Sequence, residues 1–183
     1  MGTIEQFNKY VMHSYGRYAL VMDKGEGRCA EDEDGKEYID FGSGIGTNSL
    51  GYCNEDWVNA VCEQAHKLQH TSNYYYTKIQ ADFAKALCET ADYNDMFFGN
   101  SGAEANECAI KIARKYSFDK YGKGRHNIIT LLNSFHGRTL CTLSATGQDV
   151  FHNYFFPFVE GFINVEANNI DDLRAKLDDT VCA

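Results

Sequence analysis

The sequence contains little proline, fewer basic than acidic residues and no long apolar run. A single proline among 183 residues, together with 44% hydrophobic and 14% aromatic residues, excludes a disordered or collagen-like chain. Seventeen basic residues stand against 26 acidic ones, and the net charge of −9 repels nucleic-acid phosphates and anionic lipid headgroups. The sequence has no stretch of about 18 apolar residues and no basic-then-apolar leader. We therefore expect a folded, cytoplasmic chain with neither nucleic-acid nor membrane partners.

The cysteines and histidines form no metal or redox motif. The seven cysteines are odd in number and scattered, with no Cys-x-x-Cys pair, so free thiols in a reducing compartment are the simpler interpretation. His66 and His70 have i,i+4 spacing, but the pattern supplies no third ligand, and we expect no metal site. The run Tyr74–Tyr76 is typical of a substrate entrance or, more often, of a half-buried surface or dimer contact.

The N-terminal part predicts a short β meander followed by helices. Two turn signals, Lys24-Gly25 and the stronger Asp34-Gly35, separate three apolar stretches. The expected strands are 19–22, 27–30 and 37–41. A glycine-rich stretch at 42–46 follows, and apolar residues at helical spacing then predict two helices, Trp57–Leu68 and Gln80–Thr90.

From Asp95 onward, strands and helices alternate. The expected elements are a strand at 96–98, a helix at 103–120, strands at 128–132 and 162–165, a helix at 171–177 and the beginning of a strand at 180–183. One apolar face of the helix at 103–120 is expected to be buried, and it consists of Ala105, Cys108, Ala109, Ile112, Ala113 and Tyr116. This alternation predicts an α/β fold with a βαβ sheet that is unfinished at Ala183.

A small-residue turn precedes the helix that begins near residue 103. The unpaired backbone N–H groups of Gly102 and Ala103, at the positive end of the helix dipole, are suited to bind a phosphate, and the Ser101 hydroxyl can add a hydrogen bond. An ordinary capping box is the alternative, because Ser101 and Glu104 have the Ser-x-x-Glu spacing that satisfies a helix N-terminus without any ligand. Local spacing alone favours the capping box.

A second group of candidate residues directly follows the strand at 128–132. Loops at the carboxyl edge of a parallel sheet commonly bind ligands. Phe135 can stack on a planar ring and Arg138 can bind a carboxylate. Each residue also has an ordinary interpretation: Phe135 as core, His136 as a hydrogen-bonded loop residue, and Arg138 as a surface cation. Two candidate sites at one sheet edge favour the ligand-binding interpretation.

Together, these segments resemble the class III aminotransferases. The resemblance rests on residues 99–107, Gly-Asn-Ser-Gly-Ala-Glu-Ala-Asn-Glu, and 134–139, Ser-Phe-His-Gly-Arg-Thr, and segments 38–45 and 70–73 extend it over most of the chain. Asn106 resembles the acetylornithine or succinylornithine branch, because 4-aminobutyrate aminotransferases tend to have valine there.

The resemblance implies an aspartate-aminotransferase-like fold, pyridoxal-phosphate (PLP) fold type I, present in part. Residues 1–69 would contribute to the small domain, and 70–183 would form the first part of the PLP-binding large domain. The implied activity is transfer of an amino group from an N-acylated ornithine to 2-oxoglutarate, in a homodimer. The implied partners are therefore a small amino acid and a 2-oxo acid.

The resemblance also assigns roles to individual residues. Ser101, Gly102 and Ala103 would hold the phosphate of pyridoxal 5'-phosphate. Phe135 would stack on the pyridine ring, and Arg138 would bind the substrate α-carboxylate.

Two departures from the family pattern affect what the chain is expected to do. Residues 51–55 read Gly-Tyr-Cys-Asn-Glu where the family often has Gly-His-x-His-Pro, so this loop is expected to differ. PLP chemistry also requires a Schiff-base lysine and an acidic partner for the pyridinium nitrogen, which the family supplies in a later segment, and no lysine here lies in a matching motif. We therefore expect no catalytic residue in this chain and no activity of the 183 residues alone.

Three interpretations of the chain remain open. It can be the N-terminal fragment of an acetylornithine-type aminotransferase, a non-catalytic PLP- or phosphate-binding module, or one subunit of a split enzyme. The reading frame beyond Ala183 discriminates between the first and the other two.

Overall fold

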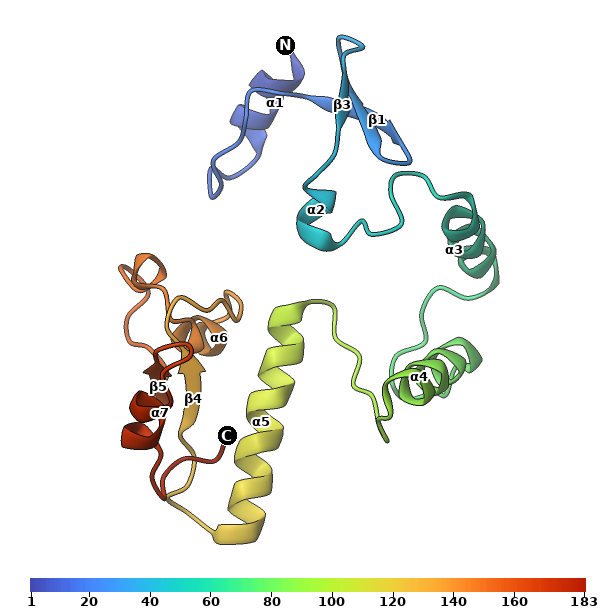
Figure 1. Cartoon of the computed structure of the whole chain (residues 1–183). Coiled ribbons are helices and arrows are strands. Elements are labelled where there is room, and N and C mark those ends of the chain that lie inside the picture. The colour runs from blue at the N-terminus through green and yellow to red at the C-terminus, as the bar shows by residue number, and fades with distance from the viewer. The chain divides into compact units, whose positions relative to one another are not determined.

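Two compact units make up the chain. The computed structural model describes all residues from Met1 to Ala183, and they divide into Met1–Tyr76 and Thr77–Ala183 (Figure 1). This unit boundary lies seven residues beyond the domain boundary expected after residue 69, and the assignment of the two parts to a small and a large domain stays a prediction. None of the helices has the length and apolar composition required to cross a bilayer.

The first unit is built around the predicted antiparallel meander. Its elements are α1 (Thr3–Tyr10), β1 (Met22–Glu26), β2 (Cys29–Asp32), β3 (Glu37–Ile39), α2 (Ser43–Gly46) and α3 (Glu55–Lys67). The strands pair in the order β1-β2-β3. The turn at Asp34-Gly35 is confirmed, since the Gly35 N–H donates to the Asp32 carbonyl at 3.0 Å.

The predicted turn at Lys24-Gly25 is wrong. Both residues lie within β1, and Glu26 pairs with Cys29, so the chain reverses at Gly27-Arg28. Gly27 has φ +52°, the left-handed conformation that glycine adopts at little cost. Either glycine was compatible with the local pattern, and the pairing of β1 with β2 decides between them.

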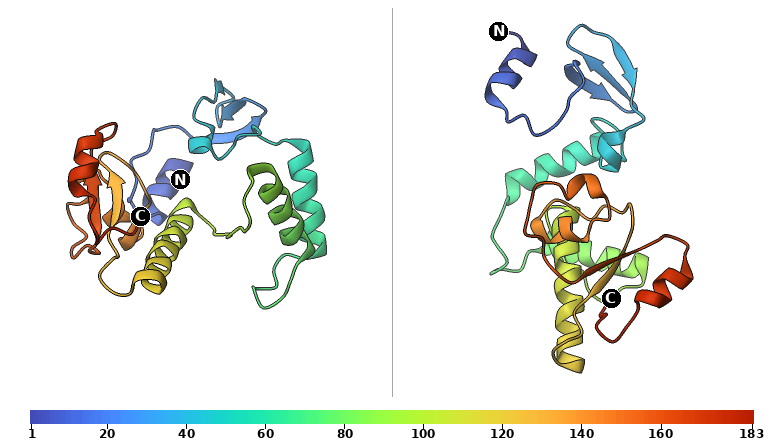
Figure 2. Two further views of the ribbon diagram at one scale, coloured as in Figure 1. Left: turned by 60° about the horizontal axis from the view of Figure 1, so that its bottom comes forward. Right: turned by 90° about the vertical axis from the view of Figure 1, so that its left-hand side faces the viewer.

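The second unit has the predicted α/β alternation. Its elements are α4 (Lys78–Ala91), α5 (Gly102–Tyr121), β4 (Ile128–Leu131), α6 (Leu140–Ala145), the 3-10 helix η1 (Asp149–Phe151), β5 (Phe162–Val165) and α7 (Ile170–Lys176). β4 and β5 pair in parallel, from Ile128 with Phe162 to Leu131 with Val165. α6 and η1 lie in the connection between these two strands (Figures 1 and 2).

The C-terminal residues extend this sheet. Val181 forms a parallel bridge with Asn127, and the Ile129 N–H donates to the Ala183 carbonyl at 2.8 Å. β4 therefore has a parallel neighbour on each side, as expected for the beginning of a strand at 180–183.

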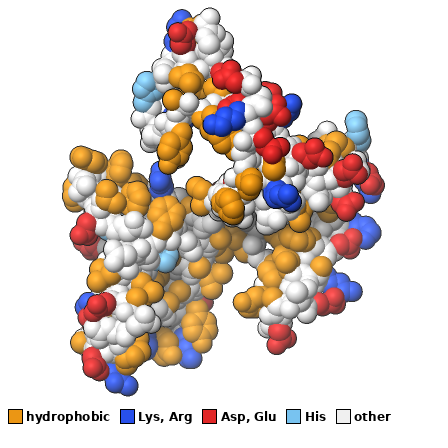
Figure 3. Space-filling view, turned by 45° about the horizontal axis from the view of Figure 1, so that its top comes forward, with side chains coloured by type: hydrophobic (Ala, Val, Ile, Leu, Met, Phe, Trp, Pro, Cys, Tyr) orange, Lys and Arg blue, Asp and Glu red, His pale blue; other side chains and the backbone are white.

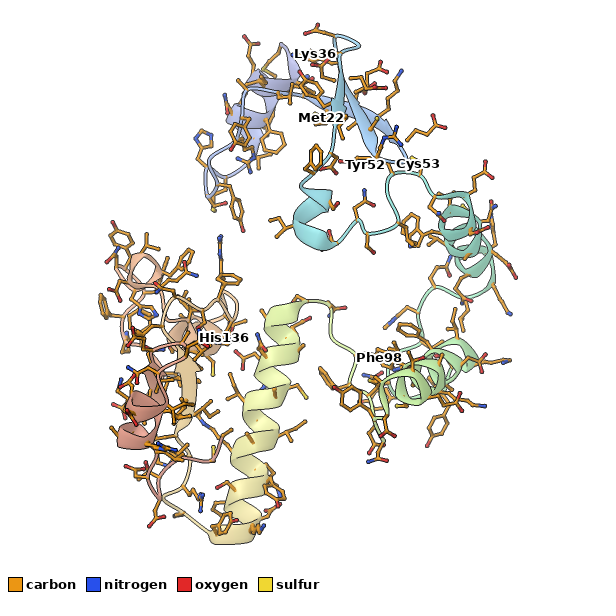
Figure 4. The ribbon with its side chains drawn as sticks, viewed as in Figure 1. Met22, Lys36, Tyr52, Cys53, Phe98 and His136 are labelled. Atoms are coloured by element: carbon orange, nitrogen blue, oxygen red, sulfur yellow. The ribbon has the colours of Figure 1, made fainter.

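The predicted strand at 96–98 is wrong. This segment has no regular structure, because no other part of the chain pairs with it and a strand exists only by pairing. Phe98 instead stacks on Phe83 of α4, with ring centroids 5.7 Å apart, and it points toward that helix in Figure 4.

The predicted buried face of α5 is also wrong. Ile110 and Ser117 are the buried residues of the helix, whereas Ile112 and Tyr116 are each 61% exposed. Ser117 faces the following loop, where its hydroxyl donates to the Arg125 carbonyl at 2.7 Å. α5 carries apolar residues on two sides, so its sequence pattern alone could not show which side is covered.

The buried core is small. In the second unit it consists of Ile110, Ile128, Leu143, Ala145, Val165 and Val181. Many larger apolar side chains stay exposed, and Figure 3 shows them over much of the visible face. The core is nevertheless sufficient to fix β4, β5 and α6, the elements that position the candidate site.

Candidate functional site

The N-terminus of α5 is capped and still has donors left over. The Ser101 hydroxyl accepts from the Glu104 N–H at 3.2 Å, and the Glu104 carboxylate turns back to accept from the Asn100 N–H. The capping interpretation is therefore correct for Ser101. It does not account for the N–H groups of Gly102 and Ala103, which have no acceptor within the chain. A capped helix and an anion site can coexist here.

Space is available next to these two donors. A Cβ atom added to Gly102 would meet no atom within 4 Å. An anion can therefore approach the first turn of α5 closely, where the helix dipole favours negative charge.

The loop after β4 packs directly on this first turn. Gly137 is buried and has φ +131°, and a Cβ atom at this position would lie 2.7 Å from the Ala103 Cβ. Only glycine permits both the backbone conformation and the close contact. The two motifs expected at one edge of the sheet are thus in contact.

Two side chains of α5 hold this loop in place. The Asn106 amide donates to the His136 carbonyl at 2.7 Å, and the Thr139 hydroxyl donates to the Glu107 carboxylate. Thr139 is also the N-cap of α6, since its hydroxyl accepts from the Thr142 N–H at 3.1 Å. The helix that carries the anion site and the loop that carries Phe135 and Arg138 therefore form one connected structure.

Two buried polar atoms of the loop have no partner in the chain, the Ser134 Oγ and the His136 Nε2. His136 lies on the side of the loop that faces α5 (Figure 4). Its backbone is satisfied, because its N–H donates to the Thr146 hydroxyl at 3.0 Å. A buried polar atom without a hydrogen bond costs about 1–3 kcal/mol, so both atoms fit a site that takes up a further polar group.

The aromatic and cationic candidates lie side by side. Phe135 is 53% exposed, so part of its ring is available to a ligand. The Arg138 guanidinium lies 6.0 Å from the centre of that ring. The structure therefore brings Phe135 and Arg138 together, on a loop that touches the first turn of α5.

Sequence reasoning missed one member of this group, Phe151. Its ring centre lies 5.9 Å from that of Phe135, and the Arg138 guanidinium lies 5.5 Å from it. Residues 149–158 contain many aromatic residues but have no helical or strand periodicity, so no sequence signal distinguishes Phe151 from its neighbours.

The candidate residues include neither a reactive thiolate nor a group of metal ligands. Burial raises the pKa of the Cys141 thiol, and the nearby Glu107 carboxylate adds to this effect, so the thiol is protonated at neutral pH. No group of three His, Cys, Asp or Glu side chains is arranged to hold a metal ion. The chemistry available to these residues is the binding of an anion, a planar ring and a carboxylate.

The chain is similar to known proteins over nearly its whole length. The class-III aminotransferase family model matches residues 10–183. The acetylornithine aminotransferase of Haemophilus ducreyi is 50% identical over 175 residues, which cover 95% of this chain and 44% of that protein. That of Methanocaldococcus jannaschii is 44% identical over 180 residues, covering 98% and 45%.

Solved structures of transaminases have the same fold. An ornithine aminotransferase from Toxoplasma gondii with partial occupancy of PLP superposes with a TM-score of 0.94 at 30% identity, over 98% of this chain and 43% of that one. An omega transaminase from Pseudomonas jessenii in complex with PMP has a TM-score of 0.83 at 26% identity, over 91% and 39%. The chain thus spans less than half the length of these relatives.

Proposed function

The chain belongs to the class-III aminotransferases, and we propose that its 183 residues provide the phosphate-binding and carboxylate-binding part of a PLP site of the acetylornithine type. Its α/β fold is a part of the fold type I, aspartate-aminotransferase-like architecture of PLP-dependent transaminases. One observation carries the proposal: the close contact of Gly137 with Ala103 unites the anion site of α5 with the loop of Phe135 and Arg138.

Each candidate residue has a role in this proposal that follows from its position. The N–H groups of Gly102 and Ala103 bind the cofactor phosphate, while Ser101 caps the helix and keeps those groups oriented. Phe135 covers one face of the pyridine ring and excludes water from it. Arg138 binds the α-carboxylate of the substrate through the planar edge of its guanidinium.

The cofactor, when bound, would supply the electron-withdrawing ring that stabilises negative charge at the carbon bearing the transferred amino group. The chain's own residues bind and orient the cofactor and the substrate. We propose that the lysine which reacts with the cofactor is contributed by residues other than these 183, since no lysine here lies in a matching motif. By itself the chain is then inactive.

The relatives suggest the substrates. The acetylornithine aminotransferases among them are up to 50% identical to this chain, which supports an N-acylated ornithine as amino donor and 2-oxoglutarate as acceptor. A homodimer is the proposed assembly.

The phosphate role can be separated from simple helix capping with Gly102→Ala. In the product of the complete reading frame, this change should leave thermal stability unchanged or slightly higher, because alanine favours the helix and its Cβ meets nothing. Affinity for PLP should fall about tenfold, because the added methyl group occupies the space through which the phosphate approaches the two N–H groups and weakens its hydrogen bonds to them. Spectroscopic titration with PLP, and competition by inorganic phosphate, measure this affinity.

Gly16→Ala is the matched control, since its added Cβ also meets nothing within 4 Å and it lies in the other unit. Unchanged PLP affinity in Gly102→Ala would show that the first turn of α5 is an ordinary capped helix N-terminus, and it would overturn the proposal.

A further inference from the structure

Phe151 is fixed in position by hydrogen bonds on both sides of it. The Gln148 side-chain amide donates to the Ser134 carbonyl at 3.1 Å, next to Phe135 in the chain. On the other side, His152 Nε2 lies 2.9 Å from the Leu143 carbonyl and is hydrogen-bonded to it. The Phe151 N–H itself donates to the Gln148 carbonyl at 3.1 Å. A residue held in this way can serve as a fixed support for its neighbours.

The two residues that Phe151 meets are those with proposed ligand roles. Its ring packs against Phe135 at an interplanar angle of 60°, a tilted arrangement that aromatic pairs favour. Phe135 is 53% exposed, so burial alone does not determine how its ring is turned. The contact with Phe151 restricts that orientation.

Arg138 lies within cation–π distance of both rings, 5.5 Å from Phe151 and 6.0 Å from Phe135. A ring attracts the flat face of a guanidinium, whereas a carboxylate binds at the edge, where the N–H groups point. A guanidinium that meets Phe151 through its flat face keeps its N–H edge directed away from that ring, an orientation compatible with carboxylate binding.

We propose that Phe151 is a positioning residue that fixes the orientations of Phe135 and Arg138, and thereby helps the site to bind a substrate carboxylate. This inference rests on the proposed function for the identity of the ligand. The contacts themselves belong to the chain and can be tested without it.

Phe151→Leu tests the role, because leucine keeps an apolar side chain and removes the ring. In the product of the complete reading frame, the KM for the amino donor should rise about two- to fivefold, which corresponds to one cation–π contact. The KM should change more than kcat, and the affinity for inorganic phosphate should stay unchanged, because the proposed phosphate donors, the N–H groups of Gly102 and Ala103, lie on a different element. Phe151→Tyr retains the ring and should restore the wild-type KM.

A second readout is independent of activity. The Nε–H resonance of Arg138, assigned by its loss in Arg138→Lys, should carry a ring-current shift from Phe151. Phe151→Leu should remove this shift and Phe151→Tyr should retain it. Phe155→Leu is the control, because Phe155 lies nearby in the chain and its ring packs against Tyr154, with the ring centroids 6.4 Å apart.

Three results would overturn the inference. The first is an unchanged Arg138 resonance in Phe151→Leu, whatever happens to KM. The second is an unchanged KM in an active protein, and the third is an equal effect of Phe155→Leu. If the wild-type protein neither binds PLP nor transfers amino groups, the proposed function fails, and the Arg138 resonance still decides whether Phe151 positions this side chain.

Discussion

At the scale of single residues, the proposed carboxylate-binding role of Arg138 can be tested through the shape of its side chain. Its guanidinium can bind both oxygens of a carboxylate through two parallel hydrogen bonds, which the ammonium of lysine cannot reproduce. In the complete protein, Arg138→Lys should raise the KM for the amino donor about tenfold or more, because one charge-assisted hydrogen bond is lost. Steady-state kinetics with acetylornithine measure this change. A normal KM would show that Arg138 does not bind the substrate.

Tyr52 gives a second prediction at this scale, in the loop that departs from the family pattern. Its hydroxyl donates to Asp40 Oδ2 at 2.8 Å, while the N–H groups of Gly42 and Ser43 donate to Asp40 Oδ1. The Tyr52 hydrogen bond, followed by these two backbone bonds, lowers the pKa of the Asp40 carboxyl. Ile45, two residues beyond Ser43, has φ +60°, an unusual conformation for a β-branched residue.

Tyr52→Phe should therefore raise the pKa of Asp40 toward its ordinary value. Because the folded-state pKa is lowered, Asp40 stabilises the fold above its unfolded pKa of about 3.9, and this contribution is lost as the pH falls through the folded pKa. In the variant, that loss should begin at a higher pH. A carbon-13 titration of the Asp40 carboxyl measures the change, and an unchanged titration would show that Tyr52 does not stabilise the carboxylate.

At the scale of elements, the connection between α5 and the loop after β4 explains why Asn106 matters. Its amide donates to the His136 carbonyl, an interaction that an apolar side chain cannot make. Asn106→Leu should accelerate amide hydrogen exchange in residues 134–139 about tenfold, since a lost hydrogen bond to a half-buried carbonyl costs about 1–2 kcal/mol. Lys111→Ala, on the exposed side of α5, is the control. Unchanged protection in Asn106→Leu would mean that the loop is held by Gly137 packing and Thr139 alone.

The elements also show how far the sequence predicts this structure. α5, β4 and β5 were predictable because helical periodicity and short apolar runs are local properties. Which face of α5 is buried was not predictable, because Ile112 is as apolar as Ile110 and Tyr116 adds a large aromatic ring to the other face. Which face is covered depends on the neighbours of the helix. The strand at 96–98 failed for the related reason that no pairing partner is present.

The candidate site was likewise predictable from the sequence only in part. Ser101 to Ala103 and the loop of Phe135 were recognisable because each lies where a strand ends or a helix begins. Phe151 was not, because its significance comes from contacts with Phe135 and Arg138, which lie on a different segment of the chain. Roles for these residues stay predictions.

At the scale of the whole molecule, both units expose large apolar side chains. Tyr18, Phe41 and Ile45 are each at least 93% exposed in the first unit, and Ile112 and Tyr116 are each 61% exposed in the second. Such surface favours association until other protein covers it.

Residues 1–183 expressed alone should therefore elute from a size-exclusion column earlier than a 20.7 kDa monomer, because they associate. They should also bind a hydrophobic dye. They should transfer no amino group from acetylornithine to 2-oxoglutarate when PLP is added. A well-behaved monomer would refute the expected association, and measurable turnover would show that a lysine of this chain performs the chemistry. The reading frame after Ala183 then separates a longer enzyme from a module or a split subunit.

The most direct test of the central claim is a crystal structure of the complete protein with PLP bound. The account predicts that the cofactor phosphate accepts hydrogen bonds from the N–H groups of Gly102 and Ala103, at about 2.7–3.2 Å, and that Phe135 lies against the face of the pyridine ring. A phosphate beyond hydrogen-bond distance of both N–H groups, or a cofactor bound away from the loop of Phe135, would contradict it.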